Sequence, residues 1–247
     1  MEGKVHLEKN NNIGRIQFSH NKGNSLPIAL LQKLMDAFKT ADEDPDIRVI
    51  ILESKGNAFC AGASLSELKN VKNIEQGTKF FMGFAYLLNC LRKMSKFVLA
   101  RDHGKVVGGG VGLVSACDYA FATERAQIKL SELSIGLGPY IIEPAVSRKI
   151  GTTAFAQLSL ESTNWKSAQW GLNKGLYAKL VSDDSALETA VNQKVDKLAH
   201  YSPEACRELR KLHWKDTQDW ETLLPKNAEI TAQLALTDFT QNMIKSL

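Results

Sequence analysis

The chain opens with two segments in which polar and apolar residues alternate, the pattern of half-buried β-strands. Residues 4–9 and 13–18 each place their apolar side chains on one face, and the Asn-rich stretch 10–12 between them favours a turn. The apolar positions are Val5, Leu7, Ile16 and Phe18. These features predict an N-terminal β-hairpin.

Beyond residue 20 the pattern switches between helical spacing and short apolar runs. Apolar residues three and four apart predict helices, and compact apolar runs predict strands. One helix is expected from Pro27 to Phe38, and others are expected at 65–69, 76–94 and 111–117. Strands are expected at 47–52, 97–101, 119–122 and 127–130. The alternation of strand and helix predicts a layered α/β core. Phe81, Phe84, Leu88 and Leu91 lie on one face of their helix, which we assign to the core.

After Pro144 helical spacing dominates. Helices are expected at 145–150, 152–160, 167–172, 185–198, 203–214 and 221–244, with one strand at 178–182. The predicted organisation is therefore an α/β core, residues 1–145, followed by a helical section, residues 146–247.

Composition narrows the class of protein. Of 247 residues, 44% are hydrophobic and 23% are charged, as in ordinary globular proteins. The net charge of +4 is scattered without a basic run, which disfavours nucleic acid but suits an anionic small molecule such as a nucleotide or CoA. The four cysteines form no close pair, so buried free thiols in a cytoplasmic protein are expected. No apolar run is long enough to predict a membrane span.

Two turns rich in small residues follow predicted strands: Ala61-Gly62-Ala63 and Gly108-Gly109-Gly110. Without Cβ atoms in the way, the backbone N–H groups of such turns can approach a ligand oxygen. Two N–H groups around one oxygen would stabilise a thioester carbonyl as it becomes an oxyanion. Glu132, some twenty residues later, could act there as an acid/base. The competing interpretation is that small residues only let a helix pack tightly on a strand.

Other chemistries fit less well. Gly110-x-Gly112 followed by Glu132 imitates a dinucleotide fingerprint, but the third small residue is Ser115 and the preceding 101–105 segment is polar rather than a buried strand. The five histidines show no metal-ligand spacing, and no phosphate loop or nucleophile elbow occurs. His103 is interpreted as a surface turn residue in preference to an acid/base. No metal and no redox cofactor are expected.

The order and wording of the motifs resemble the enoyl-CoA hydratase/isomerase (crotonase) superfamily over essentially the whole chain. The segments that carry the resemblance are Phe59-Cys60-Ala61-Gly62-Ala63-Ser64-Leu65, Gly108-Gly109-Gly110-Val111-Gly112-Leu113, Cys117-Asp118, Leu130-Ser131-Glu132-Leu133 and Ile135-Gly136-Leu137-Gly138-Pro139. The resemblance implies a crotonase-like spiral of ββα turns, followed by helices that assemble a homotrimer or a dimer of trimers.

The resemblance also implies roles for individual residues. The N–H groups of Ala63 and Gly109 would form the oxyanion hole, and Glu132 would be the acid/base. An acyl-CoA thioester would be the substrate, with CoA arriving as part of it. The residues expected to line the CoA channel and the acyl pocket are Asn24, Leu26, Ala61, Gly62, Ser64, Leu65, Gly108, Gly112, Pro139 and Glu143.

One position departs from the two-glutamate hydratases of the family. They carry a second glutamate where this chain has Gly112. Glu132 would then have to activate water and also protonate the α-carbon, or another group would have to help, or the hydration of simple enoyl-CoAs would be slow. Hydration is the expected reaction, with isomerisation or decarboxylation as alternatives within the family. A non-catalytic acyl-CoA-binding subunit is the alternative outside enzymes, and RNA binding is a weaker one.

The individual residues within these motifs resemble one branch of the superfamily, the bacterial methylglutaconyl-CoA hydratases of leucine breakdown. That branch also has glycine at the position of Gly112, and its substrates bear a distal carboxylate. Glu143 stands where the branch usually has a small residue. Two interpretations remain open for it: a helix N-terminal glutamate favoured by the helix dipole, or a second carboxylate that points into the acyl pocket.

Overall fold

The structure is a computed structural model that describes residues 3–246. Its strands are β1 (Lys4–Asn10), β2 (Ile13–Ser19), β3 (Val49–Ser54), β4 (Ala58–Cys60), β5 (Phe97–Asp102), β6 (Lys105–Val107), β7 (Tyr119–Thr123), β8 (Gln127–Lys129), β9 (Lys166–Ser167) and β10 (Lys179–Val181). They form a six-stranded sheet in the order β1-β2-β3-β5-β7-β10 and a four-stranded sheet in the order β4-β6-β8-β9.

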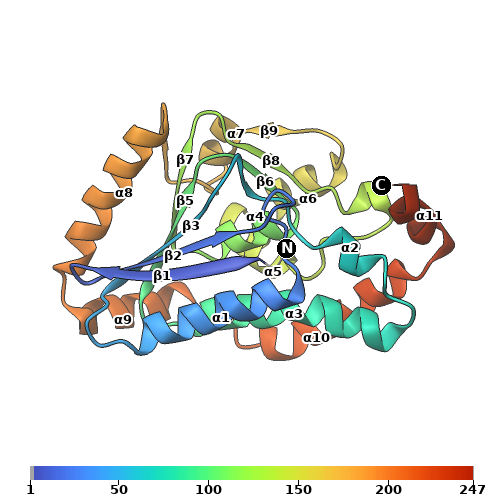
Figure 1. Ribbon diagram of the computed structural model, residues 1–247, viewed down its shortest axis with the longest axis horizontal. Coiled ribbons are helices and arrows are strands. Elements are labelled where there is room, and N and C mark those ends of the chain that lie inside the picture. The colour runs from blue at the N-terminus through green and yellow to red at the C-terminus, as the bar shows by residue number, and fades with distance from the viewer. Residues whose placement is uncertain (1–2, 247) are drawn as a thin grey trace.

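The helices connect and cover these sheets (Figure 1). They are α1 (Ile28–Glu43), α2 (Leu65–Leu68), α3 (Ile74–Lys93), α4 (Gly109–Ser115), the 3₁₀ turn η1 (Leu133–Ile135), α5 (Glu143–Ile150), α6 (Thr152–Leu160), α7 (Ala168–Asn173), α8 (Asp184–Ala199), α9 (Pro203–His213), α10 (Trp220–Ala235) and α11 (Asp238–Ser246).

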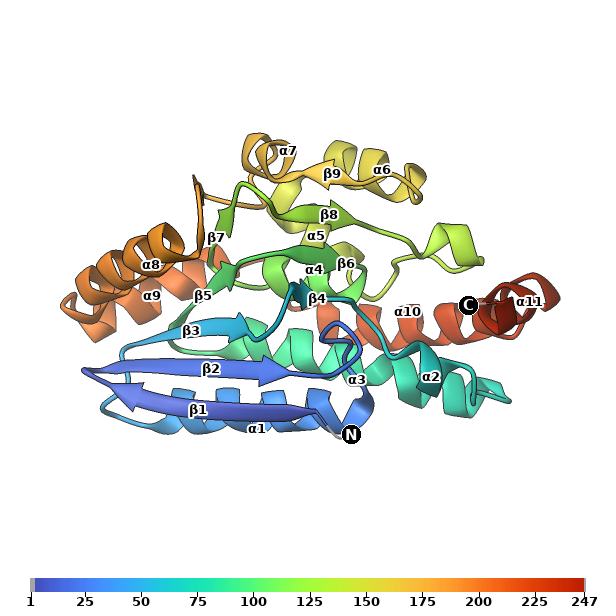
Figure 2. The same cartoon turned by 45° about the horizontal axis from the view of Figure 1, so that its top comes forward.

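The chain advances as a spiral. In three successive turns one strand joins the large sheet, the next joins the small sheet, and a helix follows: β3-β4-α2/α3, β5-β6-α4 and β7-β8-α5. The neighbouring strands of successive turns are parallel, so their ends gather at one edge of each sheet. Figure 2 shows the small sheet stacked beside the large one, with α4 and α5 next to it.

The main hydrophobic core lies between the sheets and helices α1, α3, α4, α5 and α10. A second cluster joins the other face of the large sheet to α8.

Helix α3 carries Phe81 and Phe84, both buried as predicted, and α10 packs along it. The first turn of α3 is capped by Asn73, whose side chain accepts from the Gln76 N–H at 2.9 Å. The guanidinium of Arg210 donates to backbone carbonyls at its last turn. Helix α3 is therefore fixed at both ends beneath the turns of the spiral.

Most predicted elements are present, including the hairpin and the Ser64 cap of α2, whose Oγ accepts from the Glu67 N–H at 3.4 Å. Two predictions about secondary structure need correction. The single helix expected over 221–244 is two helices, because Thr237 caps a new one: its Oγ accepts the Thr240 N–H at 3.4 Å. The short strands β4, β6 and β9 were not expected.

His103 is not the surface turn residue that the sequence suggested. It is 5% exposed, and its Nε2 lies 2.7 Å from the Gly56 carbonyl oxygen. The reason is that the chain passes here from β5 in one sheet to β6 in the other, so the connection lies inside. Asp102 just before it is fully buried at the end of β5, so the segment judged polar is in part a buried parallel strand.

Candidate active site

The two small-residue turns meet because β4 and β6 are parallel neighbours. A Cβ added to Gly62 would lie 2.8 Å from the Val107 carbonyl oxygen and 3.2 Å from the Gly109 nitrogen. Gly62 also has φ +83°, a conformation that glycine adopts without strain. The turn after β4 and the start of α4 therefore touch only because residue 62 has no side chain.

The outer side of the first turn is held by the loop that precedes α1. Leu26 N–H donates to the Gly62 carbonyl at 2.8 Å, and Ala61 N–H donates to the Gly23 carbonyl at 3.0 Å. Within residues 3–246, neither the Ala63 N–H nor the Gly109 N–H donates to another group of the chain. Both residues line the same cavity. Two unpaired backbone donors beside one cavity are the arrangement that an oxyanion requires.

Glu132 faces this pair of turns. Its Oε1 would lie 2.7 Å from a Cβ added to Gly108, so the carboxylate sits directly over the first glycine of the triplet. Its Oε2 is buried and has no hydrogen-bond partner in the described chain. Burial raises the pKa of the Glu132 carboxyl to about 7, although a bond from its own backbone opposes the shift. A carboxyl with that pKa can both accept and return a proton near neutral pH.

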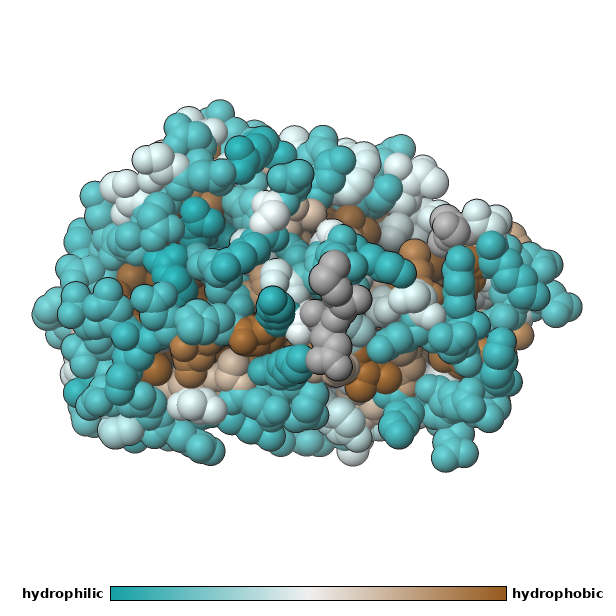
Figure 3. Space-filling view, in the orientation of Figure 1, coloured by the Kyte–Doolittle hydropathy of each residue, from teal (hydrophilic) through white to brown (hydrophobic). Residues whose placement is uncertain are grey.

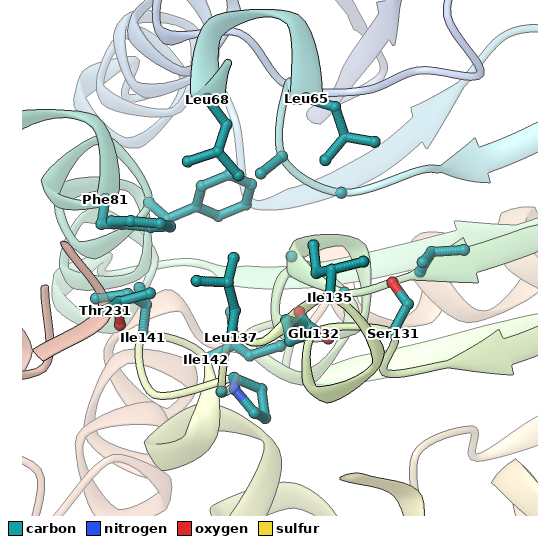
Figure 4. Close-up of a pocket in the computed structure, with 18 of the residues that line it drawn as sticks. Leu65, Leu68, Phe81, Ser131, Glu132, Ile135, Leu137, Ile141, Ile142 and Thr231 are labelled. Carbon is teal, nitrogen blue, oxygen red and sulfur yellow. The ribbon is translucent and has the colours of Figure 1, made fainter. Parts of the chain in front are cut away.

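The cavity measures about 330 Å³ and is mostly apolar. In Figure 4 Leu65 and Leu68 of α2 point into it from one side, and Leu137, Ile141 and Ile142 face them from the opposite loop. Ser131 lies at one end, Phe81 and Thr231 at the other, and Glu132 between them. The shape suits an extended acyl chain whose reactive carbons lie beside the carboxylate.

Gly112, the position of the missing glutamate, is packed under Ile142. A Cβ at residue 112 would lie 2.4 Å from Ile142 Cγ2 and 2.7 Å from Ile142 Cβ. Even alanine would require Ile142 to move, and a glutamate would need the space that its methyl groups fill. Ile142 lines the cavity from this side. Where this chain has Gly112 in place of a glutamate, the hydrophobic side chain of Ile142 on the facing loop therefore fills the space.

The structure brings some of the predicted site residues together and places others behind them. Those that line the cavity are Ala61, Gly62, Ala63, Leu65, Gly108, Gly109, Glu132 and Pro139. Those outside its lining, among the described residues, are Asn24, Leu26, Ser64, Gly112 and Glu143.

The predicted residues outside the lining have structural contacts of their own. The Asn24 amide donates to the carbonyls of Lys55 and Ala58 at 2.5 and 2.8 Å, which joins its loop to β4. Leu26 pairs with Ala63 in an isolated parallel bridge. Glu143 is the first residue of α5, as expected for a glutamate placed by the helix dipole.

Several cavity residues were not identified from the sequence. Phe81 and Phe84 were assigned to the core, and they do belong to it, but both also line the cavity. The Phe84 ring would lie 2.3 Å from a Cβ added to Gly109, so it covers the start of α4. Thr231 reaches the cavity from α10, far along the chain, and no local pattern could have indicated it.

A second cavity, of about 300 Å³, adjoins the first and shares Ala61, Ala63 and Leu65 with it. Two exposed lysines, Lys22 and Lys69, also line it. The cavity that adjoins the one with the buried carboxylate is therefore lined by two cations. Such a field would attract an anionic ligand.

Residues 3–246 contain no cluster of three or more side chains suited to a metal ion. No helix in that range is both long and apolar enough to cross a membrane. On the face shown in Figure 3, hydrophobic residues form separate patches among hydrophilic ones.

The family model described as enoyl-CoA hydratase/isomerase matches residues 8–245. Mitochondrial enoyl-CoA hydratase of Pongo abelii is 31% identical over 197 residues, which are 78% of this chain and 66% of that protein. A peroxisomal Delta(3,5)-Delta(2,4)-dienoyl-CoA isomerase of Arabidopsis thaliana is 25% identical over 73% of this chain and 69% of its own length. The chain thus spans about two-thirds of these curated relatives.

Solved structures share the whole fold. A putative enoyl-CoA hydratase from Mycobacterium avium paratuberculosis K-10 superposes with a TM-score of 0.90 at 26% identity, over 98% of this chain and 95% of that one. The likeness extends over both sheets and the C-terminal helices, so the predicted crotonase-like α/β fold is confirmed.

Proposed function

The chain belongs to the enoyl-CoA hydratase/isomerase family, and on that premise we propose that it adds water across the conjugated double bond of an enoyl-CoA thioester. The observation that carries the proposal is the Glu132 carboxylate over Gly108, buried and with one oxygen unpaired, beside the free N–H groups of Ala63 and Gly109.

The reaction needs one proton carrier and one oxyanion site. The thioester oxygen accepts hydrogen bonds from the Ala63 and Gly109 N–H groups. A water oxygen bonds to the β-carbon while the Glu132 carboxylate takes a proton from that water, and the electrons of the double bond pass to the thioester oxygen as an enolate. The enolate then collapses, and its α-carbon takes the proton back from Glu132. One carboxylate thus serves both halves of the addition.

Isomerisation is the second candidate, and the packing of Ile142 over Gly112 favours it. Moving a double bond needs only one base: Glu132 removes a proton from the α-carbon of a 3-enoyl thioester and returns it to the γ-carbon of the dienolate. Hydration also needs a held water molecule, for which two or more polar partners are usual. Over Gly112 the cavity is lined by the hydrocarbon of Ile142, so a water molecule on that side has fewer polar partners.

The CoA portion would enter past Ala61 and Leu65, with its phosphates near Lys22 and Lys69. Within the described lining of the main cavity, Lys129 is the only cationic side chain. If the acyl group carries a distal carboxylate, as in methylglutaconyl-CoA of leucine breakdown, Lys129 is the group that would meet it. Trimeric or hexameric assembly also stays a proposal, which analytical ultracentrifugation would test.

The proposal is tested by incubating the enzyme with three thioesters: crotonyl-CoA, 3-methylglutaconyl-CoA and 3-hexenoyl-CoA. Loss of the conjugated absorbance of either 2-enoyl thioester reports hydration, and its gain from 3-hexenoyl-CoA reports isomerisation. Glu132→Gln is the matched variant, since it keeps the shape and removes the base. Hydration that the substitution abolishes supports the proposal.

Gain of absorbance from 3-hexenoyl-CoA alone would replace hydration by isomerisation. Thioester binding without turnover of any substrate would instead indicate a non-catalytic acyl-CoA-binding protein.

A further inference from the structure

The loop from Ser131 to Ile142, which carries Glu132, has little regular structure of its own. Its strand ends at Lys129, and the only element inside it is the short 3₁₀ turn η1. Within it, the Glu132 carbonyl accepts from the N–H groups of Ile135 and Leu137 at 3.1 and 2.9 Å. The position of the carboxylate therefore depends on what holds the far side of this loop.

Helix α11 holds it through Gly136. Thr240 is fully buried, and its Oγ1 donates to the Gly136 carbonyl at 3.1 Å while accepting from Thr237 Oγ1 at 3.1 Å. Gly136 has φ +83°, and a Cβ there would lie 2.3 Å from Thr240 Oγ1 and 2.7 Å from the Phe239 ring. The loop and α11 are thus in direct contact, with no space for a side chain between them.

Helix α10 fixes the same loop at a second point. The Asn227 amide donates to the Tyr140 carbonyl at 2.8 Å, and Thr231 of the same helix reaches the cavity. The loop is therefore held four residues after Glu132 and again eight residues after it. Both anchors come from the last thirty residues of the chain.

We propose that Thr240 is a positioning residue for Glu132: its hydroxyl holds the Gly136 carbonyl, and the η1 turn transmits that constraint to the carboxylate over Gly108. The inference rests on the proposed function, since it gives Thr240 a role only if Glu132 acts on the substrate. Thr240 itself does not line the cavity and touches no reacting atom.

The test is a set of substitutions at Thr240. Thr240→Val keeps the shape and removes the hydroxyl, and Thr240→Ser restores the hydroxyl. We expect Thr240→Val to lower kcat about ten- to a hundredfold with KM changed less than about twofold, because a small misplacement of a catalytic group has effects of this size. Thr240→Ser should keep kcat within about threefold of the wild type, since its hydrogen bond remains. Thr222→Val, which removes an exposed hydroxyl from α10, is the matched control.

A second measurement separates positioning from a merely structural role. The Glu132 carboxyl is titrated by ¹³C NMR in wild type, Thr240→Val and Thr240→Ser. Loss of the anchor should let water reach the carboxyl and lower its titration midpoint in the valine variant only. Lys129 is the other ionisable side chain of the described cavity lining, and none of the substitutions changes it.

The outcomes distinguish the two claims. Thr240→Val with a lower melting temperature but unchanged kcat and Glu132 titration would overturn the positioning role. Full activity in Glu132→Gln would overturn the proposed function instead. If the valine variant does not fold, Thr240→Ala, which relieves any crowding, takes its place in both measurements.

Discussion

Two buried carboxyls lie near opposite ends of the short strand β6, and they differ in what surrounds them. Asp102, just before β6, accepts from the Tyr177 hydroxyl at 2.5 Å and from the Gly104 N–H at 2.9 Å. Glu132, beside the glycines after β6, leaves Oε2 unpaired and borders a cavity. Burial raises the pKa of each to about 7. A raised pKa therefore does not distinguish the two carboxyls; the unpaired oxygen and the adjoining cavity make Glu132 the candidate catalytic group.

The largest expected effect separates the two carboxyls. Glu132→Gln should lower kcat about a hundred- to ten-thousandfold while the fold stays intact, because a catalytic base is lost. Asp102→Asn should instead destabilise the fold by roughly 1–3 kcal/mol, since it disturbs a buried hydrogen-bonded group. Steady-state kinetics and thermal unfolding of both variants give the comparison. Equal loss of activity in both, at equal stability, would contradict it.

The next effect concerns the backbone beneath Glu132. Gly108→Ala should lower activity about a hundredfold. The added Cβ would lie 2.7 Å from Glu132 Oε1, too close for both to stay in place, and a misplaced catalytic group has an effect of this size. Gly56→Ala is the control: φ there is +90°, but nothing lies within 4 Å of the added Cβ. Both should lose about 1 kcal/mol of stability from the strained backbone. Similar kinetics in the two variants would argue against the placement of Glu132.

The raised pKa of Glu132 predicts that the stability of the fold depends on pH. Its pKa is about 7 in the folded protein against an ordinary value of 4.5, so the folded state keeps a proton that the unfolded state loses. Its contribution to the free energy of unfolding is present below pH 4.5 and is lost as the pH rises toward 7. Glu132→Gln avoids this loss and should be about 2–3 kcal/mol more stable than wild type at pH 8, but not at pH 4.

Calorimetry of wild type and Glu132→Gln across that range measures the difference. A constant difference between pH 4 and 8 would mean that the carboxyl is not buried in solution. The activity should follow the opposite course, rising as the base form of Glu132 appears near pH 7.

A smaller change is expected from rebuilding the second carboxylate. Gly112→Glu alone should fold poorly, because Ile142 fills the space that it needs. Gly112→Glu combined with Ile142→Ala makes that space and should raise hydration relative to isomerisation about tenfold, since an added acid/base contributes at least this much. The ratio of the two products, with Ile142→Ala alone as the control, reports the change. An unchanged ratio would mean that Ile142 does not decide between the reactions.

The smallest effect lies at the entrance. Lys22→Ala and Lys69→Ala should each raise KM for a CoA thioester about two- to fivefold at low salt and less at high salt, because exposed charges are screened. Lys197→Ala on α8, at the other end of the molecule in Figure 1, is the control. Equal salt dependence in all three variants would remove the two lysines from the binding route.

From the sequence we could propose the parts of the candidate site that lie in local motifs, but not the residues that distant segments bring to it. The small-residue turns and Glu132 could be found because glycine and a lone carboxylate are visible as residue types. Ile142 over Gly112 could not, because its effect depends on a loop thirty residues away folding back. Thr231 and Thr240 come from helices whose spacing indicated one long element, and only the packed structure shows the break at Thr237 that turns α11 onto Gly136.

The most direct measurement of the central claim follows the α-hydrogens of butyryl-CoA in D₂O by NMR. This saturated thioester can form an enolate, but it can be neither hydrated nor isomerised, so exchange at its α-carbon reports the proton transfer alone. We predict that the wild-type enzyme exchanges these hydrogens and that Glu132→Gln slows the exchange at least about a hundredfold. Equal exchange in both enzymes, or none in the wild type while butyryl-CoA is bound, would contradict the claim that Glu132 moves a proton beside the oxyanion turns.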